Sequence, residues 1–262
     1  MTTSVVMAVW NRLPLTRACL ESLRGTSEPF ELCVVDNGST DGTAEYFRRW
    51  PHPFPLRYTR NGDNVGLIRA LNQGATLARG DLLCFLHNDT EMRDLRWLGR
   101  LRSALDGDGV GLAGLYGARR LRRDGRYAGR TIVHCLEGGA NLRGDSMEVA
   151  AVDGVCLALP RALFDAVGGF DEGYGFFHGY DRDLSFAVRE AGRRCVVVSA
   201  PFVHRGGGTR AADPSPERTA ADLEARRAAL ARFAAKWRRR LPCDVRTWSQ
   251  RLADRFAPQP PR

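Results

Sequence analysis

Residues 31–43 read Glu-Leu-Cys-Val-Val-Asp-Asn-Gly-Ser-Thr-Asp-Gly-Thr, and this stretch decides the fold. Leu32–Val35 is a short apolar run, which predicts a buried strand. The polar cluster Asp36–Ser39 ends that strand in a tight turn. Thr40 or Asp41 then supplies the cap of a helix that we expect to run to about Trp50. A strand, a turn and a helix in this order are the building unit of α/β proteins.

The same unit repeats on both sides of this stretch. We expect further strands at Ser4–Val9, Leu56–Thr59 and Asp81–Leu86, with helices at Pro14–Arg24 and Val65–Ala78 between them. Strands separated by helices of this length form parallel sheets with right-handed crossovers. Ligands of such sheets bind at the carboxyl ends of the strands, where Asp36 and Asp89 fall.

The second half of the chain is less regular. The sequence predicts helices over 93–105, 160–167, 181–191 and 216–240, strands over 110–116 and 195–199, and a long apolar strand signal over 147–159 that Asp153-Gly154 interrupts. We expect a solvated loop over 119–130, which carries six arginines, and a glycine-rich loop over 168–179.

Composition excludes several classes of protein. The chain has 262 residues, 44% hydrophobic and 26% charged, which is ordinary for a globular protein. No apolar run reaches the ~18–20 residues of a membrane span, and the start lacks the basic region of a signal peptide. The seven cysteines form no Cys-x-x-Cys pair, so we expect reduced thiols in a cytoplasmic protein.

The net charge of +9 is concentrated at one end. Residues 1–204 hold 25 basic and 24 acidic residues, whereas residues 205–262 hold 14 basic and 6 acidic residues. The predicted helix over 216–240 carries an apolar stripe through Leu230, Phe233 and Trp237 between arginines. The stripe packs on the domain, on a second subunit, or on an anionic membrane surface.

Four polar positions carry candidate chemistry, each with a plain structural alternative. Asp36 starts a turn into a helix, which suits a nucleotide phosphate or simply caps the turn. Asp89 ends a strand, as a cation ligand or as a surface residue. Asp181 heads a helix, as a general base or as a favourable charge on the helix dipole. His204 precedes Gly206–Gly208, which admits a phosphate or forms a linker.

Taken together and in order, eight segments match one family. They are Ser4–Arg12, Val34–Thr43 (VVDNGSTDGT), Asn64–Gly66 with Ala70–Gly74 (ALNQG), Leu86–Asp89, Val152–Gly154, Gly168–Glu172 (GGFDE), Tyr180-Asp181 and His204. From Val5 to Thr209 the sequence resembles the family-two glycosyltransferases, in particular their rhamnosyltransferase-like branch. The resemblance implies the GT-A fold, an α/β fold with a Rossmann-like nucleotide-binding half and a mostly parallel central sheet. It also implies a glycosyltransferase domain over 1–210, with its nucleotide half at 1–90 and its acceptor half at 91–210, followed by a basic helix and tail over 211–262.

The resemblance further implies an inverting transfer from a UDP- or dTDP-sugar, with Asp181 as the general base. The residues implied to bind the nucleotide are Ala8, Val9, Asn11, Asp36, Asn37, Asn64, Gly66, Asn72 and Asn88. Asp89 and His204 are implied to bind Mn²⁺ or Mg²⁺, and Asp153, Gly154, Tyr180 and Asp183 to meet the sugar or acceptor.

Two motifs depart from the family pattern. The Asp-x-Asp motif reads His87-Asn88-Asp89, so only its last carboxylate remains, and imidazole favours manganese over magnesium. The Glu-Asp motif reads Tyr180-Asp181, so the base is present without its acidic neighbour, which Asp183 is expected to replace.

Other functions remain open at this point. A metal-independent or non-catalytic homologue would keep nucleotide-sugar binding. A sugar nucleotidyltransferase would need a glycine-rich loop, and Val9–Pro14 contains no glycine. A nucleic-acid-binding role is suggested by the charge alone, since no recognition motif accompanies the arginines. The expected partners are a nucleotide-sugar and a glycan, lipid-linked saccharide or small-molecule acceptor in polysaccharide biosynthesis, with a homodimer through the C-terminal helix or contact with the inner membrane face as further expectations.

Overall fold

The computed structural model describes residues 2–137, 139–142, 144–206 and 216–256. A central sheet of eight strands runs through the molecule in the order β10-β13-β6-β12-β4-β1-β2-β3. Its strands are β1 Thr3–Val9, β2 Glu31–Asp36, β3 Leu56–Arg60, β4 Leu82–Leu86, β6 Val110–Gly114, β10 Ser146–Val149, β12 Cys156–Pro160 and β13 Arg194–Val198. β3, β2, β1 and β4 are parallel, β12 pairs antiparallel with β4 and β6, and β13 is parallel to β6. The prediction of a mostly parallel α/β sheet is confirmed.

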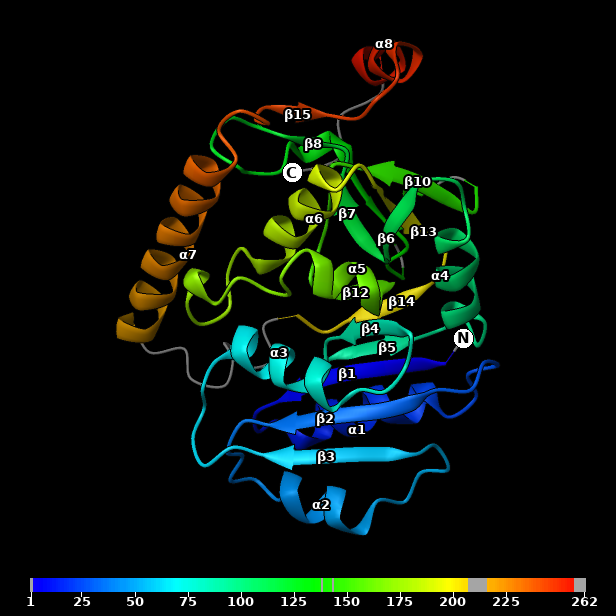
Figure 1. Cartoon of the computed structure of the whole chain (residues 1–262), viewed down its shortest axis with the longest axis vertical. Coiled ribbons are helices and arrows are strands. Elements are labelled where there is room, and N and C mark those ends of the chain that lie inside the picture. The colour runs from blue at the N-terminus through cyan, green and yellow to red at the C-terminus, as the bar shows by residue number, and fades with distance from the viewer. Residues whose placement is uncertain (1, 138, 143, 207–215, 257–262) are drawn as a thin grey trace.

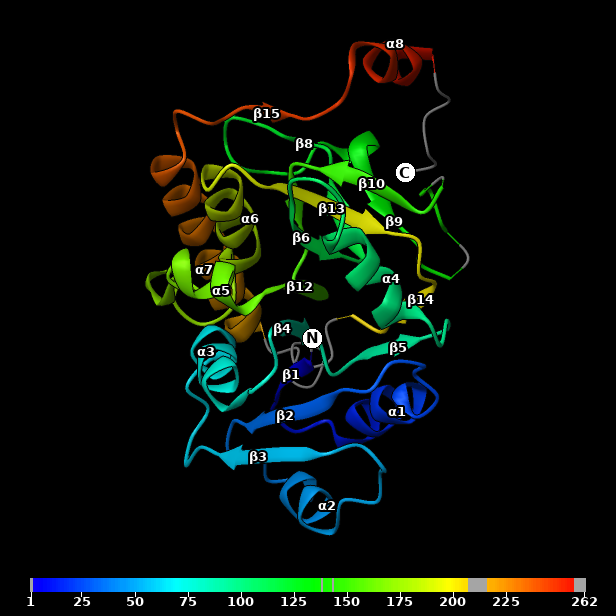
Figure 2. The ribbon, with the colours of Figure 1, turned by 45° about the vertical axis from the view of Figure 1, so that its right-hand side comes forward.

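Helices cover both faces of this sheet (Figures 1 and 2). They are α1 Leu13–Leu23, α2 Thr43–Arg49, α3 Leu67–Leu77, α4 Trp97–Leu105, α5 Arg161–Ala166, α6 Tyr180–Glu190, α7 Pro216–Lys236 and α8 Trp248–Phe256, with 3-10 turns η1 Gly129–Thr131 and η2 Glu172–Tyr174. Figure 2 shows α1 and α4 at one side of the sheet and α3, α6 and α7 at the other.

The sheet separates two hydrophobic cores. Val5, Met7 and Val9 of β1 face the core formed with α1 and α4, while Val6 faces the core formed with α3, α6 and α7. Side chains alternate along a strand, so a strand buried on both faces reads as a continuous apolar run. This is why the short strands stood out in the sequence.

Seven short strands form three small sheets beside the central one. They are β5 Thr90–Met92, β7 Tyr116–Ala118, β8 Arg120–Leu121, β9 Ile132–His134, β11 Ala151–Val152, β14 Phe202–His204 and β15 Cys243–Asp244. The expectation of a fully solvated loop over 119–130 is wrong at Leu121, which is fully buried because β8 pairs with β15. β8 and β15 lie more than 100 residues apart in the sequence, so no local pattern predicted that they pair.

The apolar stripe of α7 packs on the domain itself. Ala229 and Phe233 are buried in the core beneath α6, and Phe233 packs edge-to-face on Phe186 with ring centroids 4.9 Å apart. All seven cysteines are free thiols, six of them buried, as expected. Gly207 and Gly208 of the glycine run lie outside the described residues. In the part of the chain that the structure describes, every helix is too short or too polar to span a bilayer.

Candidate active site

The site lies where the carboxyl ends of the parallel strands meet. β1, β2 and β4 end there, followed by Trp10, Asn37 and His87. β12 runs the opposite way, with Cys156 opposite Leu86 of β4, so its amino end lies at the same edge. Antiparallel pairing therefore adds Asp153 and Gly154, which precede β12, to residues contributed by the parallel strands.

A cavity of about 720 Å³ opens at this edge. Eight of the predicted site residues line it, namely Ala8, Val9, Asn37, Asn64, Asn88, Asp89, Gly154 and His204. The rest of the lining was not named among the predicted site residues, and it includes Trp10, Phe176, Phe177 and four residues near the start of α7, Thr219, Ala221, Asp222 and Ala225. Helix α7 is therefore part of the cavity wall.

The turn after β2 forms one end of the cavity. Asp36 is fully buried and accepts hydrogen bonds from the Ser39 amide and the Tyr58 hydroxyl, each at 2.8 Å, with the Arg60 guanidinium 3.6 Å away. Asn37 lies next to it, faces the cavity, and donates to the carbonyl of Gly66 at 3.1 Å. Asp36 thus holds the turn, and Asn37, which also accepts a hydrogen bond from Asn61 at 2.8 Å, ties it to the neighbouring loops.

Other predicted nucleotide-binding residues organise the loops around the cavity. Asn11 has a left-handed backbone (φ 54°) and accepts the Thr40 amide at 2.7 Å. Asn64 accepts the Gly66 amide at 3.0 Å, and Asn88 donates to the Thr16 hydroxyl at 2.8 Å. These bonds position the loops that follow β1, β3 and β4.

Asn72 lies elsewhere. It donates to the carbonyl of Phe170 at 2.9 Å and accepts the amide of the same residue at 3.1 Å, and so joins α3 to the Gly168–Glu172 segment. Asn11, Asp36, Gly66 and Asn72 are not among the described residues that line the cavity.

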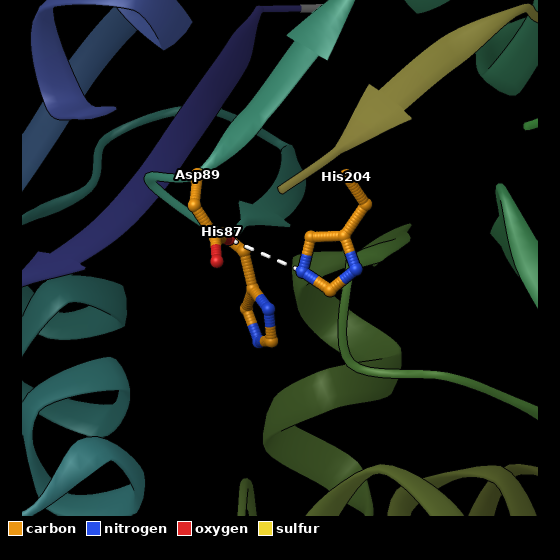
Figure 3. A group of neighbouring side chains, drawn as sticks. All are labelled: His87, Asp89 and His204. Carbon is orange, nitrogen blue, oxygen red and sulfur yellow. Dashed lines mark ion pairs between the residues drawn. The ribbon is translucent and has the colours of Figure 1, made fainter. Parts of the chain in front are cut away.

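His87, Asp89 and His204 form a cluster in the cavity wall (Figure 3). One donor atom from each lies within 4.8 Å of the others, and His204 Nε2 is 3.2 Å from Asp89 Oδ1. β14 pairs antiparallel with β5 and places His204 opposite Thr90, next to Asp89. Two imidazole nitrogens and a carboxylate oxygen suit a divalent transition metal.

The charge state of Asp89 fits this role. Burial disfavours its ionised form, but the hydrogen bond and charge of His204, together with the charge of His87, lower the pKa of Asp89 below its ordinary value. The carboxylate is therefore ionised at neutral pH. His87 was not predicted as a ligand, although it occupies the first acidic position of the Asp-x-Asp motif.

The predicted base lies behind Gly154 at the start of α6. Asp181 is 8% exposed and accepts the Gly154 amide at 3.3 Å. Tyr180 is buried and its hydroxyl is 3.0 Å from His87 Nε2, so α6 contacts the histidine cluster directly. A β-carbon on Gly154 would lie 2.1 Å from that hydroxyl, which explains why glycine stands there.

Asp153 completes a pair of carboxylates with Asp181. Burial, and then the charge of Asp181, raise the pKa of Asp153 to about 6. The guanidinium of Arg182 lies over the ring of Tyr127 at 4.3 Å from its centroid, and its positive charge acts on both carboxylates. Carboxylates whose environments differ are suited to different proton-transfer roles.

Asp183 points away from the cavity. Two residues apart on a helix means about 200° of rotation, so Asp181 and Asp183 lie on opposite sides of α6. Asp183 accepts hydrogen bonds from the Tyr174 hydroxyl (2.8 Å), Lys236 (2.8 Å) and Trp237 (2.7 Å). It joins α6 to α7.

Comparisons with known proteins point to one family and one fold. The profile of glycosyl transferase family 2 matches residues 4–155. Among curated relatives, an N-acetylglucosaminyl-diphospho-decaprenol L-rhamnosyltransferase of Mycobacterium tuberculosis is 28% identical over 80% of this chain and 78% of its own length. The O-antigen biosynthesis protein RfbC of Myxococcus xanthus is 29% identical over 82% of this chain but only 18% of its own length, and an uncharacterized protein of Sinorhizobium fredii is matched over 26% of its length. The chain thus spans about a quarter or less of these two longer relatives.

Solved structures show the same fold. A mannosyltransferase of Pyrobaculum calidifontis, in complex with GDP-Man and Mn²⁺, superposes with a TM-score of 0.60 at 19% identity, covering 89% of this chain and 73% of the other. GalNAc-T7 with UDP, GalNAc and Mn²⁺ gives a TM-score of 0.62 at 18% identity, covering 78% and 43%. At such identities the likeness shows the fold alone, which is GT-A.

Proposed function

Because this chain belongs to glycosyl transferase family 2, we propose that it moves a hexose from a UDP- or dTDP-sugar to an acceptor hydroxyl with inversion at the anomeric carbon. The observation that carries the proposal is the cavity at the carboxyl edge of the sheet, which joins Asn37, the histidine cluster and Gly154 in one space. A nucleotide-sugar lying along this cavity would place its diphosphate next to Asp89.

The nucleotide end of the donor is assigned to the loops after β1, β2 and β3. Ala8 and Val9 form an apolar wall, while Asn37 and Asn64 offer polar groups to the base and ribose. We assign Asp36, Asn11 and Gly66 no direct contact with the donor. Their hydrogen bonds hold these loops in position.

His87, Asp89 and His204 would hold the cation, and Asn88 lies beside them. When bound there, Mn²⁺ or Mg²⁺ would supply positive charge to the diphosphate leaving group. Tyr180 holds the His87 ring in place through its hydroxyl.

Asp181 is the proposed general base. Its carboxylate would accept the proton of the acceptor hydroxyl as that oxygen attacks the anomeric carbon. The Gly154 amide orients it, and we assign Asp153 to the acceptor or the transferred sugar. The hydrogen-bonding capacity of Asp183 is used by α7, so we do not assign it a contact with substrate.

The acceptor class is inferred from the relatives. The rhamnosyltransferase that matches over most of its length has a lipid-diphosphate saccharide in its name, and RfbC is named for O-antigen biosynthesis. We therefore favour a lipid-linked saccharide over a small molecule. The free thiols are consistent with the proposed cytoplasmic location, where cysteines stay reduced.

The first test is Asp181→Asn. The substitution keeps the shape and the hydrogen bond from Gly154 but removes the basic oxygen, so kcat should fall about 10²–10⁴-fold while nucleotide binding stays unchanged and the protein stays folded. Asp165→Asn, at an exposed position of α5, is the matched control. Turnover at the wild-type rate in Asp181→Asn would refute the assignment.

The second test concerns the cation. EDTA should abolish transfer and Mn²⁺ or Mg²⁺ should restore it. Calorimetry with Mn²⁺ and nucleoside diphosphate should show binding by the wild type, and at least about tenfold weaker binding by Asp89→Asn, because a charged ligand is replaced by a neutral one. Full activity after thorough chelation would show a metal-independent enzyme.

A further inference from the structure

The short C-terminal helix α8 is held on the body by one face only. Its Asp254 accepts hydrogen bonds from Arg119 at 3.0 Å and from Arg246 at 2.9 Å. Arg246 is in turn paired with Asp244 of β15 at 2.8 Å, and both arginines are only 11% exposed at their side chains. This half-buried ion-pair network fixes the rotation of α8 about its axis.

The opposite face of α8 is apolar and uncovered. Leu252 lies about 200° around the helix from Asp254, and Trp248 lies one turn before Leu252. Trp248 is 78% exposed and Leu252 41% exposed. Trp248 is the most exposed large hydrophobic side chain among the described residues. Figure 1 shows α8 projecting from the end of the molecule beyond β15.

Basic residues lie at the same end of the molecule as α8, on β8 and its turn and after the end of α7 (Figure 1). Arg120 in β8 lies opposite Asp244 of β15, Arg122 and Arg123 come next in the adjacent turn, and Arg238 and Arg239 come after α7 on the way to β15. All five are exposed, and no carboxylate of the described residues forms an ion pair with any of them. The apolar face of α8 and these arginines therefore belong to the same end of the molecule (Figure 1).

We propose that Trp248 and Leu252, together with the arginines of β8, its turn and the end of α7, dock this end of the protein on an anionic lipid surface. Tryptophan is favoured at the boundary between water and lipid, and arginines near the bilayer gain about 1 kcal/mol each from anionic headgroups. The two features reinforce each other in a helix that lies in the plane of the interface.

A second copy of the chain fits this surface less well. A symmetric dimer through α8 would bring the positively charged ends of two copies together, which charge repulsion opposes. Two apolar side chains also provide much less than the roughly 800 Å² per partner of a stable interface. The docking surface is separate from the cavity and does not depend on the proposed reaction.

The test is sedimentation of the full-length protein with vesicles. In 50 mM salt we expect binding to vesicles of phosphatidylcholine with phosphatidylglycerol, little binding to phosphatidylcholine alone, and release in 0.5 M salt. The double variant Trp248→Ser/Leu252→Ser should bind at least about tenfold more weakly, because each substitution removes an apolar side chain from the lipid contact.

The control removes equally exposed apolar groups elsewhere. Leu95→Ser/Leu223→Ser, at positions 55% and 47% exposed, should bind as the wild type does. Circular dichroism and thermal melting of both variants verify folding. Absence of binding to anionic vesicles, equal binding by the α8 variant, or a dimer in analytical ultracentrifugation that the α8 variant abolishes would each overturn the proposal.

Discussion

Asp153 is a buried carboxyl group of the candidate site whose pKa is raised. It lies in the turn before β12, next to Asp181, and two carboxylates this close resist losing both protons. Burial and this repulsion raise its pKa to about 6, against 3.8 for an ordinary aspartate. The raised pKa also predicts how stability depends on pH.

Between about pH 4 and 6 the unfolded chain gives up the Asp153 proton while the folded protein retains it. Stability from this residue is therefore fully present below pH 4 and is lost as pH rises to 6. We expect Asp153→Asn, which cannot ionise, to gain stability relative to the wild type across this window and to keep the gain at pH 7. Urea denaturation in EDTA at pH 4, 5, 6 and 7 measures the difference.

Asp165→Asn is the control for this series, because its side chain is exposed. A wild-type to Asp153→Asn difference that is constant with pH would show that Asp153 titrates normally in the folded protein.

At the scale of elements, α7 matters more than its sequence indicated. Its apolar stripe was read from helical spacing, although the helix ends at Lys236 and not at the predicted residue 240. Its packing on α6, the ion pairs of Lys236 with Asp171 (3.0 Å) and Asp183 (2.8 Å), and its place in the cavity wall come from tertiary contacts. Lys236 is the single lysine of the chain, and it lies at this junction.

Phe233→Ala tests how firmly α7 is bound. Phe233 is fully buried against Phe186, so its truncation should cost about 3–5 kcal/mol in the free energy of unfolding. Leu223→Ala on the same helix, at a position 47% exposed, should cost much less. Urea denaturation of both variants measures the two losses in the free energy of unfolding. Equal effects would mean that α7 does not share the core in solution.

The whole molecule raises the question of where the catalytic domain ends. The predicted boundary near residue 210 would leave α7 outside the domain, yet Ala229 and Phe233 are buried in the same core as Tyr174 and Phe186. We expect a chain ending at Arg205 to lose cooperative unfolding and to bind hydrophobic dyes, because those core side chains become exposed. A chain ending at Thr247 lacks α8 but keeps α7 and β15, and it should melt cooperatively.

Dye binding and calorimetric melting of the two truncated chains measure this. A cooperative melt of the shorter chain near the wild-type temperature would instead place the domain boundary at the predicted position.

The amino-acid sequence by itself determined the order of strands and helices in the first 90 residues and the parallel sheet. It also indicated that the candidate site lies at the carboxyl ends of the parallel strands. These depend on local information, since period, turn residues and caps all act within a few positions. The motifs around Asp36, Asp89 and Asp181 were found for the same reason. Strands of two or three residues, such as β5, β14 and β15, carry no period, so their pairing was not predictable.

Only the tertiary structure decided which of these residues face one another. The β5–β14 pair brings His204 to Asp89 across more than 100 residues, and the opposite faces of α6 separate Asp181, behind the cavity, from Asp183, beneath α7. Pairing with β8 buried Leu121 in a segment that reads as a solvated loop. Ion pairs of Asp254 turned the apolar face of α8 outward. Such contacts depend on where distant parts of the chain meet, which no local pattern specifies.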